Sequence, residues 1–315
     1  RNRHAKLRIG YISPDFCMHA VAYFSYVLLH DYDRQRFEVT CYANCHEDGL
    51  SERFKAMADH WCNIYGLTSE QAAQKIYADE IDILFDLSGH TQHNCLPVLA
   101  WKPAPIQISG IGFMGTTGLP AVDYFLGDCY TDEPALQQKL PVVAADWQTP
   151  PELPRVIASA EFTERLLLLP HSHFCYASYD APAQPYPAPY RQQGHITFGC
   201  FNNFSKVTDV LLRLWAQILA QVPGAHLFLK SAIFNDAYGT KKALARLRAA
   251  GIPLACVETG RHEPGYLREY ARVDIALDTY PYPGGATTCD ALYMGVPVVT
   301  LAGKRHNARF GYSLL

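Results

Sequence analysis

The chain has 315 residues, of which 49% are hydrophobic, and it carries a formal net charge of −3 with a pI near 6.5. This balance does not favour a nucleic-acid-binding protein, which normally has a strongly basic surface. No apolar run approaches the ~18–20 residues of a membrane-spanning helix, and the first residues lack the apolar core of a secretory signal. We therefore expect a cytoplasmic protein without a membrane span or a nucleic-acid partner, long enough to form two domains.

The first half of the chain alternates strand-like and helix-like segments. Residues 7–12 and 37–42 read as buried strands and residues 21–30 as a helix between them, which predicts a βαβ unit. Three of the strands end in small polar loops, as expected where a sheet edge forms a ligand-binding cleft, although plain connecting loops would look the same. The further elements expected in this half are a helix at 70–79 and strands at 81–87, 103–108 and 162–169.

His19 lies in the loop between the first strand and the first helix. In open α/β sheets, ligands bind at the carboxyl ends of the strands, which is where this loop begins. A lone loop histidine is often structural or simply exposed, so its position alone does not give His19 a catalytic role.

Two proline-rich stretches interrupt the alternation. Residues 134–158 show no clear period, and residues 181–194 are rich in proline and nearly free of charge, which is typical of an extended linker. We therefore predict an N-terminal Rossmann-like lobe over 1–185 and a C-terminal Rossmann-like lobe over 186–315.

The second half predicts another doubly wound α/β unit, and it contains no internal repeat of fixed period. We expect strands at 195–200, 225–230, 254–259, 275–277 and 298–301, and helices at 208–220, 240–250, 266–272 and 287–294.

Residues 274–303 contain the most chemical information. A short strand runs into Asp278, and a turn with Gly284 and Gly285 leads to the helix over 287–294. A helix entered from a glycine loop presents unpaired N–H groups and the positive end of its dipole, so this end suits a phosphate. An ordinary βα turn fits the pattern equally well, and neither a P-loop nor a dinucleotide-binding motif is present.

The ten cysteines are scattered through apolar and strand-like segments. Cys45 and His46 take part in the only close Cys/His cluster, which lacks the further ligands of a zinc site. We expect most cysteines to be small buried hydrophobic residues rather than disulfide partners, among them Cys41, Cys129, Cys175, Cys200 and Cys256.

Four separated motifs carry a family resemblance. They are, in chain order, IGYISPDFCMHA (9–20), KPAPIQISGIGFMGTTG (102–118), FGCFNNFSKVT (198–208) and LDTYPYPGGATTCDALYMGVPVVTLAG (277–303). Together they resemble the catalytic region of the O-linked N-acetylglucosamine transferase family, of the bacterial type. The resemblance implies an α/β fold of two Rossmann-like doubly wound lobes, the GT-B architecture, with the active site in the cleft between them. It further implies that the lobe over 1–185 lies on the acceptor side and that the lobe over 186–315 binds the nucleotide sugar.

The same resemblance implies an inverting glycosyltransferase that moves N-acetylglucosamine from UDP-GlcNAc to Ser/Thr hydroxyls of a protein or peptide acceptor. A SPINDLY-type protein O-fucosyltransferase that uses GDP-fucose is a close alternative. A nucleotide-sugar binding module without turnover is an alternative of another class. A sugar-nucleotide epimerase also has two such lobes, but the four motifs follow the transferase pattern.

The resemblance also assigns site residues. His19 matches an active-site histidine with an acid/base or positioning role, Lys206 matches the lysine that contacts the donor diphosphate, and Asp290 matches the residue that holds the ribose. The other donor-binding positions implied are Asn203, Gly284, Gly285, Thr287, Thr288, Gly115, Thr116 and Thr117.

Inverting transfer needs an aligned hydroxyl and a site that takes up charge on the leaving diphosphate. Lys206 and the helix amides near Thr287 would supply that charge, so we expect no metal and no cofactor. Asp278 and Asp290 have an alternative interpretation as residues of the fold, because the first turn of a helix often carries aspartate.

The chain also departs from the family pattern. Ala20, Pro283 and Ala286 replace residues that are usual there, and residues 134–158 have no recognised counterpart, which suggests an insertion or an error in the sequence. The chain ends inside an expected helix and lacks the family's tetratricopeptide repeats, so we expect a fragment whose second lobe is truncated.

Overall fold

A computed structural model describes residues 4–132, 155–178, 187–263 and 265–315. The chain divides into two compact units, Arg1–Tyr179 and Asp180–Leu315. The predicted boundary between residues 185 and 186 lies outside the described residues, as does most of the predicted insertion at 134–158.

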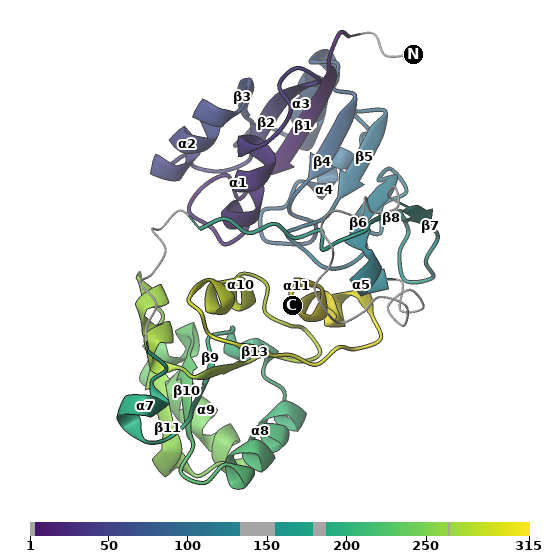
Figure 1. Cartoon of the computed structure of the whole chain (residues 1–315). Helices are drawn as coiled ribbons and strands as arrows, with labels where there is room; N and C mark the ends of the chain where they lie inside the picture. The colour runs from purple at the N-terminus through teal and green to yellow at the C-terminus, as the bar shows by residue number, and fades with distance from the viewer. Residues whose placement is uncertain (1–3, 133–154, 179–186, 264) are drawn as a thin grey trace. The chain divides into compact units, whose positions relative to one another are not determined.

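The first unit is built on a sheet whose described strands follow the order β3-β2-β1-β4-β5-β6-β8-β7 (Figure 1). All pairings in it are parallel except that between β7 and β8. The order reverses direction at β1, which makes this unit Rossmann-like. The strands are β1 (Leu7–Ser13), β2 (Phe37–Ala43), β3 (His60–Asn63), β4 (Ile83–Asp86), β5 (Ile106–Ser109), β6 (Tyr124–Asp128), β7 (Arg155–Ile157) and β8 (Arg165–Leu169).

Side-chain caps define where two helices of this unit begin. Asp48 caps α2 (Gly49–Met57), and Thr68 caps α3 (Ser69–Ala78), each in a capping box with the residue three positions later. α3 and α4 share a core cluster with buried residues of β1, β2 and β4. The helices are α1 (Ala22–His30), α2 (Gly49–Met57), α3 (Ser69–Ala78), α4 (Leu96–Leu99) and α5 (Cys129–Asp132).

The second unit contains a parallel sheet with the strand order β11-β10-β9-β12-β13, which reverses at β9. Its strands are β9 (Thr197–Cys200), β10 (His226–Lys230), β11 (Val257–Gly260), β12 (Ile275–Leu277) and β13 (Val298–Val299). Its α-helices are α7 (Tyr190–Gln193), α8 (Asp209–Gln221), α9 (Ala237–Ala249), α10 (Ala286–Tyr293) and α11 (Phe310–Leu314). Its 3-10 helices are η1 (Phe204–Lys206), η2 (Ala232–Asn235), η3 (Leu254–Cys256), η4 (Tyr266–Arg272) and η5 (His306–Ala308).

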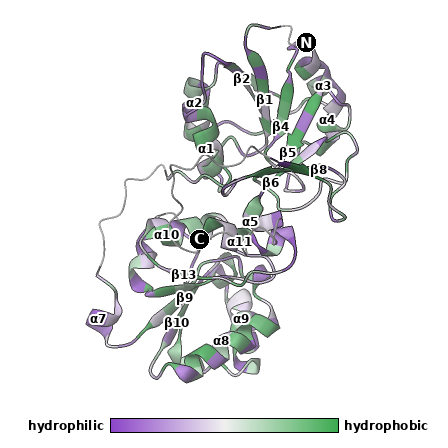
Figure 2. Cartoon of the chain, turned by 45° about the vertical axis from the view of Figure 1, so that its right-hand side comes forward, coloured by the Kyte–Doolittle hydropathy of each residue, from purple (hydrophilic) through white to green (hydrophobic). Residues whose placement is uncertain are grey.

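Both faces of this second sheet are covered. Leu227 and Leu229 of β10 join one core cluster with residues of α8 and α9, whereas Phe228 between them joins another with residues of α10 and η4. Successive side chains of a strand point to opposite faces, so the sheet has helices on both sides. Figure 2 shows hydrophobic residues along strands such as β1 and β4, while most helices carry both colours.

The predicted alternation of strands and helices is confirmed in both units, with boundaries that shift by a few residues. Two details of the prediction were wrong. The expected strand at 254–259 begins as the 3-10 helix η3, and the expected linker 181–194 contains the short helix α7. The short helix expected at 266–272 is present and has 3-10 geometry.

Sequence reasoning also missed α2, β3 and β6. β3 reads HWCN and α2 reads GLSERFKAM, so neither has a strong apolar period. Each is stabilised by neighbours in the fold, because β3 pairs with β2 and α2 packs on α1.

Most of the cysteines are buried, as expected. The expectation was wrong for Cys175, which is exposed, and for Cys256, which is partly exposed. Among the described residues, no group of His, Cys, Asp and Glu side chains has the arrangement of a metal site. None of the helices described is both long and apolar enough to cross a membrane.

Candidate functional site

The polar loops of the second unit meet where the strand order reverses. β9 and β12 are direct neighbours, with Phe198 opposite Ile275 and Gly199 opposite Ala276. The loop after β9 carries Lys206, and the loop after β12 leads into α10. Because the carboxyl ends of parallel strands share one edge, these two loops form the position where open α/β sheets bind ligands.

Asp278 organises the loop that follows β12. Its Oδ1 accepts hydrogen bonds from the amides of Thr279 at 2.7 Å and Gly284 at 2.6 Å. Its Oδ2 accepts from the Thr300 hydroxyl at 2.8 Å. Burial raises the pKa of this carboxyl, and the Gly284 amide is the largest influence in the opposite direction. These contacts favour the interpretation of Asp278 as a residue of the fold that fixes the entry to α10.

Gly284 lies in the tightest part of this loop. A Cβ atom on it would come within 2.4 Å of Thr287 Oγ1 and 2.8 Å of Asn202 Oδ1. The Thr287 hydroxyl donates to Asn202 Oδ1 at 2.8 Å, and Asn202 Nδ2 donates to Asp278 Oδ1 at 3.3 Å. The loop approaches these side chains so closely that a Cβ at position 284 would have to displace them.

The first amides of α10 remain available at this point. In the part of the chain that the structure describes, the N–H groups of Ala286 and Thr287 have no hydrogen-bond partner, whereas those of Thr288 and Cys289 donate to the Gly285 carbonyl. Such open amides at a helix N-terminus, together with the helix dipole, favour an anion.

Lys206 brings a positive charge to the same loop. Its ammonium donates to the Pro283 carbonyl oxygen at 3.1 Å and lies 4.6 Å from the centre of the Tyr282 ring. Burial lowers the pKa of Lys206, and the nearby Asp278 carboxylate opposes this effect. A half-buried cation therefore lies beside the residues that lead directly into α10.

The other residues predicted for this site have local partners. The Thr288 hydroxyl is buried and donates to the Gly284 carbonyl at 2.9 Å. Asp290 is fully buried and accepts from the Tyr266 hydroxyl at 2.6 Å. Asn203 is exposed and accepts from the Ser205 amide at 3.1 Å. Their predicted contacts with a donor stay predictions.

The first unit has a comparable edge beside β1 and β4, which are neighbours at the reversal of the strand order. His19 lies in the loop after β1, with its side chain 45% exposed and Nδ1 3.3 Å from Asp15 Oδ1. The Val21 amide donates to the same Nδ1 at 3.2 Å. A bond from Val21 requires a lone pair on Nδ1, whereas the Asp15 carboxylate favours a proton there, so the two contacts select different states of the ring.

Asp15 is mostly buried, and its Oδ2 has no hydrogen-bond partner among the described residues. Burial raises the pKa of its carboxyl, His19 opposes this, and the buried Asp86 carboxyl adds to it. Asp86 ends β4 and accepts hydrogen bonds from Ser88, Gly89 and Ser109, which fixes the adjacent loop.

The predicted donor-facing residues Gly115, Thr116 and Thr117 lie in a loop that Glu164 holds. The Thr116 hydroxyl donates to Glu164 Oε2 at 2.7 Å, and the Thr117 amide donates to Glu164 Oε1 at 2.7 Å. The Thr117 hydroxyl also donates to Oε1. Both hydroxyls thus donate to Glu164, and the predicted contact of this loop with a donor stays a prediction.

Sequence reasoning missed Asn202, Asp15 and Glu164 as members of these clusters. Asn202 and Asp15 lie inside recognised motifs, one residue from Asn203 and four residues from His19, so their signal was present. Glu164 directly precedes β8 and gave no signal, because only the pairing of β8 with β6 brings it to the Thr116 loop.

Comparisons with known proteins identify the family and the fold of the chain. The family described as glycosyl transferase family 41 matches residues 1–141 and 186–315, and it leaves residues 142–185 unmatched. A protein of Hordeum vulgare named "Probable UDP-N-acetylglucosamine--peptide N-acetylglucosaminyltransferase SPINDLY" is 37% identical over 98% of this chain and 31% of its own length. The chain therefore spans about a third of the length of such curated relatives.

Among solved structures, a Thermobaculum terrenum O-GlcNAc transferase variant superposes with a TM-score of 0.86 at 34% identity, over 100% of this chain and 56% of that one. The lipopolysaccharide outer core galactosyltransferase WaaB, at 12% identity over 93% of this chain and 80% of that one, has a TM-score of 0.52 and shows the fold alone. The predicted fold class, two Rossmann-like lobes of the GT-B type, is confirmed. The placement of an active site between the lobes stays a prediction.

Proposed function

Because the chain belongs to glycosyl transferase family 41, we propose that it carries the catalytic region of an inverting glycosyltransferase that moves N-acetylglucosamine from UDP-GlcNAc to Ser/Thr hydroxyls of proteins or peptides. The printed names of its relatives support this donor and this class of acceptor.

The observation that carries the proposal is the junction of Lys206 with the start of α10. Lys206 contacts Pro283, and the amides of Ala286 and Thr287 lie open three and four residues later. A fixed cation and aligned amides stabilise a diphosphate as it leaves with negative charge. We therefore propose that these groups bind the UDP diphosphate without a metal ion or cofactor.

We further propose that His19 acts on the acceptor hydroxyl. When the Val21 amide occupies Nδ1, the neutral ring carries its proton on Nε2 and can donate a hydrogen bond from there. This tautomer orients an acceptor oxygen. In the other tautomer the proton lies on Nδ1 towards Asp15, the lone pair of Nε2 is free to take the proton of the acceptor hydroxyl, and Asp15 stabilises the charged ring that results. Both roles place His19 at the acceptor rather than at the nucleotide.

Isothermal titration of the purified chain with UDP and GDP tests the donor site. We expect micromolar binding of UDP, much weaker binding of GDP, and loss of UDP binding in Lys206→Ala. Incubation with labelled UDP-GlcNAc and a library of Ser/Thr peptides then tests transfer, with His19→Ala as the variant that binds UDP normally but transfers at a strongly reduced, still measurable rate. Preference for GDP would instead support fucose transfer, and absence of binding by both nucleotides would contradict the proposed donor site.

A further inference from the structure

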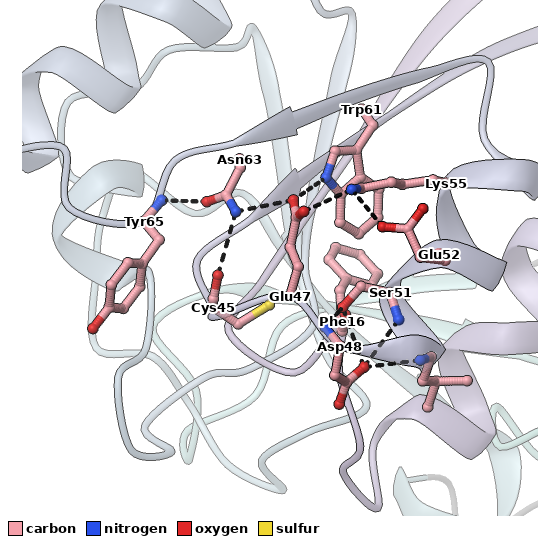
Figure 3. A network of polar contacts seen from close by, with 11 residues as sticks. Phe16, Cys45, Glu47, Asp48, Ser51, Glu52, Lys55, Trp61, Asn63 and Tyr65 are labelled. Atoms are coloured by element: carbon pink, nitrogen blue, oxygen red, sulfur yellow. Dashed lines mark hydrogen bonds and ion pairs between the residues drawn. The ribbon is translucent and has the colours of Figure 1, made fainter.

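The loop that carries His19 is attached to α2 at two points. The Ser51 hydroxyl donates to the Phe16 carbonyl oxygen at 2.7 Å, and the Met18 amide donates to Asp48 Oδ2 at 2.7 Å. His19 is the next residue after the second attachment. Figure 3 shows Phe16 beside Ser51 and Asp48 at the start of α2.

Aromatic packing fixes the first attachment. Phe16 is fully buried, with its ring centre 5.5 Å from that of Phe54 and 5.7 Å from that of Trp61. A buried ring in contact with two others has little freedom, so the carbonyl that Ser51 holds stays in place.

The two carboxylate oxygens of Asp48 have different partners. Oδ1 accepts from the Leu50 and Ser51 amides at 2.9 and 3.1 Å and so caps α2, while Oδ2 accepts from Met18. Burial raises the pKa of Asp48, but the hydrogen bonds from Met18, Ser51 and Leu50 outweigh it and lower the pKa below its ordinary value. A helix cap needs only one of these oxygens, so the bond to Met18 is additional to the cap.

The residue before Asp48 fixes the other side of this junction. Glu47 accepts from Trp61 Nε1 at 2.8 Å and from Asn63 Nδ2 at 2.9 Å, and it pairs with Lys55 at 2.6 Å. These contacts, drawn in Figure 3, tie the start of α2 to β3. The Lys55 partner is the main cause that lowers the pKa of Glu47 to about 2, so this carboxylate is charged at neutral pH.

We propose that Asp48 is a positioning residue for His19, because its Oδ2 holds the backbone next to the imidazole while its Oδ1 anchors the same carboxylate to α2. This inference rests on the proposed function, in which His19 acts on the acceptor. The bond at Met18 restricts where His19 can place its ring relative to Asp15 and Val21, and small displacements of a reacting group reduce catalysis strongly.

Asp48→Asn separates the two roles of this residue. Asparagine caps helices as well as aspartate does, so its oxygen can keep the bonds to Leu50 and Ser51. The amide nitrogen in place of Oδ2 carries hydrogens and cannot accept from the Met18 N–H. Asp48→Ser also keeps a capping oxygen and has no second acceptor, so it serves as an independent variant if Asp48→Asn folds poorly.

The chain provides a matched control in α3. Thr68 accepts from the Gln71 amide in a capping box of the same unit, and within the described part of the chain it makes no bond to the loop of His19. Thr68→Ala therefore lowers stability through a lost helix cap without touching Met18. Comparison with this variant removes the contribution of general destabilisation.

The test combines three measurements on wild type, Asp48→Asn, Asp48→Ser and Thr68→Ala. We expect hydrogen exchange of the Met18 amide to accelerate about tenfold in both Asp48 variants only. The His19 ring resonances, assigned by their loss in His19→Gln, should shift in the same two variants. With UDP-GlcNAc and the peptide library, kcat should fall about tenfold while UDP affinity stays within about twofold.

A double-mutant cycle tests whether Asp48 affects kcat through His19. If Asp48 acts through His19, Asp48→Asn added to His19→Ala lowers kcat no further. An equal further loss in the His19→Ala background would overturn the proposal, and so would unchanged His19 resonances in both Asp48 variants. If wild type neither binds UDP nor transfers sugar, the proposed function fails, while the exchange and ring measurements still decide whether Asp48 positions His19.

Discussion

Lys206 donates to the carbonyl oxygen of Pro283 at 3.1 Å, across 77 positions of the sequence. This bond joins the loop after β9 to the loop before α10. It holds the half-buried cation at the loop that leads into the open amides of α10, so the lysine and the helix end are the two groups that we propose bind the diphosphate.

Removing the charge of Lys206 should weaken UDP binding. Lys206→Met keeps the apolar stem but loses a charge-assisted contact, which corresponds to about 1.5–3 kcal/mol or roughly 10–100-fold in affinity. Titration calorimetry measures this loss. Lys242→Met is the matched control, because the exposed Lys242 lies 4.7 Å from the Tyr238 ring in the same unit. Equal effects of both substitutions would contradict a specific role for Lys206.

The lowered pKa of Lys206 predicts a pH dependence of donor binding. Burial favours the neutral amine, so the charge is lost at a lower pH than that of an ordinary lysine, and UDP-GlcNAc affinity should fall as pH rises through this range. Lys206→Arg keeps its charge throughout and should show a flatter profile. The affinity of both proteins is measured from pH 6 to 10. The uracil ring of the ligand titrates in both experiments, so its contribution cancels when the two profiles are compared. Parallel profiles would show that Lys206 does not titrate in the measured range.

Gly284 and Gly285 should respond differently to alanine. A Cβ on Gly284 would come within 2.4 Å of Thr287 Oγ1, whereas one on Gly285 meets only Phe310, at 3.6 Å. We expect Gly284→Ala to cost about 1–3 kcal/mol of unfolding free energy and to weaken UDP binding, with Gly285→Ala less harmful in both. Denaturant unfolding and calorimetry measure the two effects. A fully stable Gly284→Ala protein with unchanged UDP affinity would contradict the close approach.

Glu164 should matter for the loop that contains Thr116 and Thr117. Glu164→Gln replaces one acceptor oxygen by an NH2 group, which faces donors in a buried site, so we expect a loss of about 1–3 kcal/mol in unfolding free energy. Glu161→Gln changes an exposed carboxylate three residues earlier and should alter stability by less than about 0.5 kcal/mol. Chemical denaturation compares the two variants. Similar stabilities would show that the loop does not depend on the Glu164 carboxylate.

The sequence by itself determined the two α/β units and the loops that matter. Buried strands such as 7–12 and 81–87 can be recognised from their apolar runs, and Gly284 indicates a turn before a helix. Each of these signals depends only on residues that are neighbours in the sequence. The four motifs also placed His19 and Lys206 at strand ends. The sequence did not predict the edge strand β3 or the helix α2, since the apolar pattern of each is weak.

Only the tertiary structure decided which side chains meet. Asn202 rather than Asn203 reaches Thr287, because consecutive residues at a strand end point in different directions. Glu164 reaches Thr117 because β8 pairs with β6. Asp48 reaches Met18 because α2 begins beside the loop of His19. These contacts join residues far apart in the chain, and hydrogen bonds depend on distances that only the packed strands and helices set.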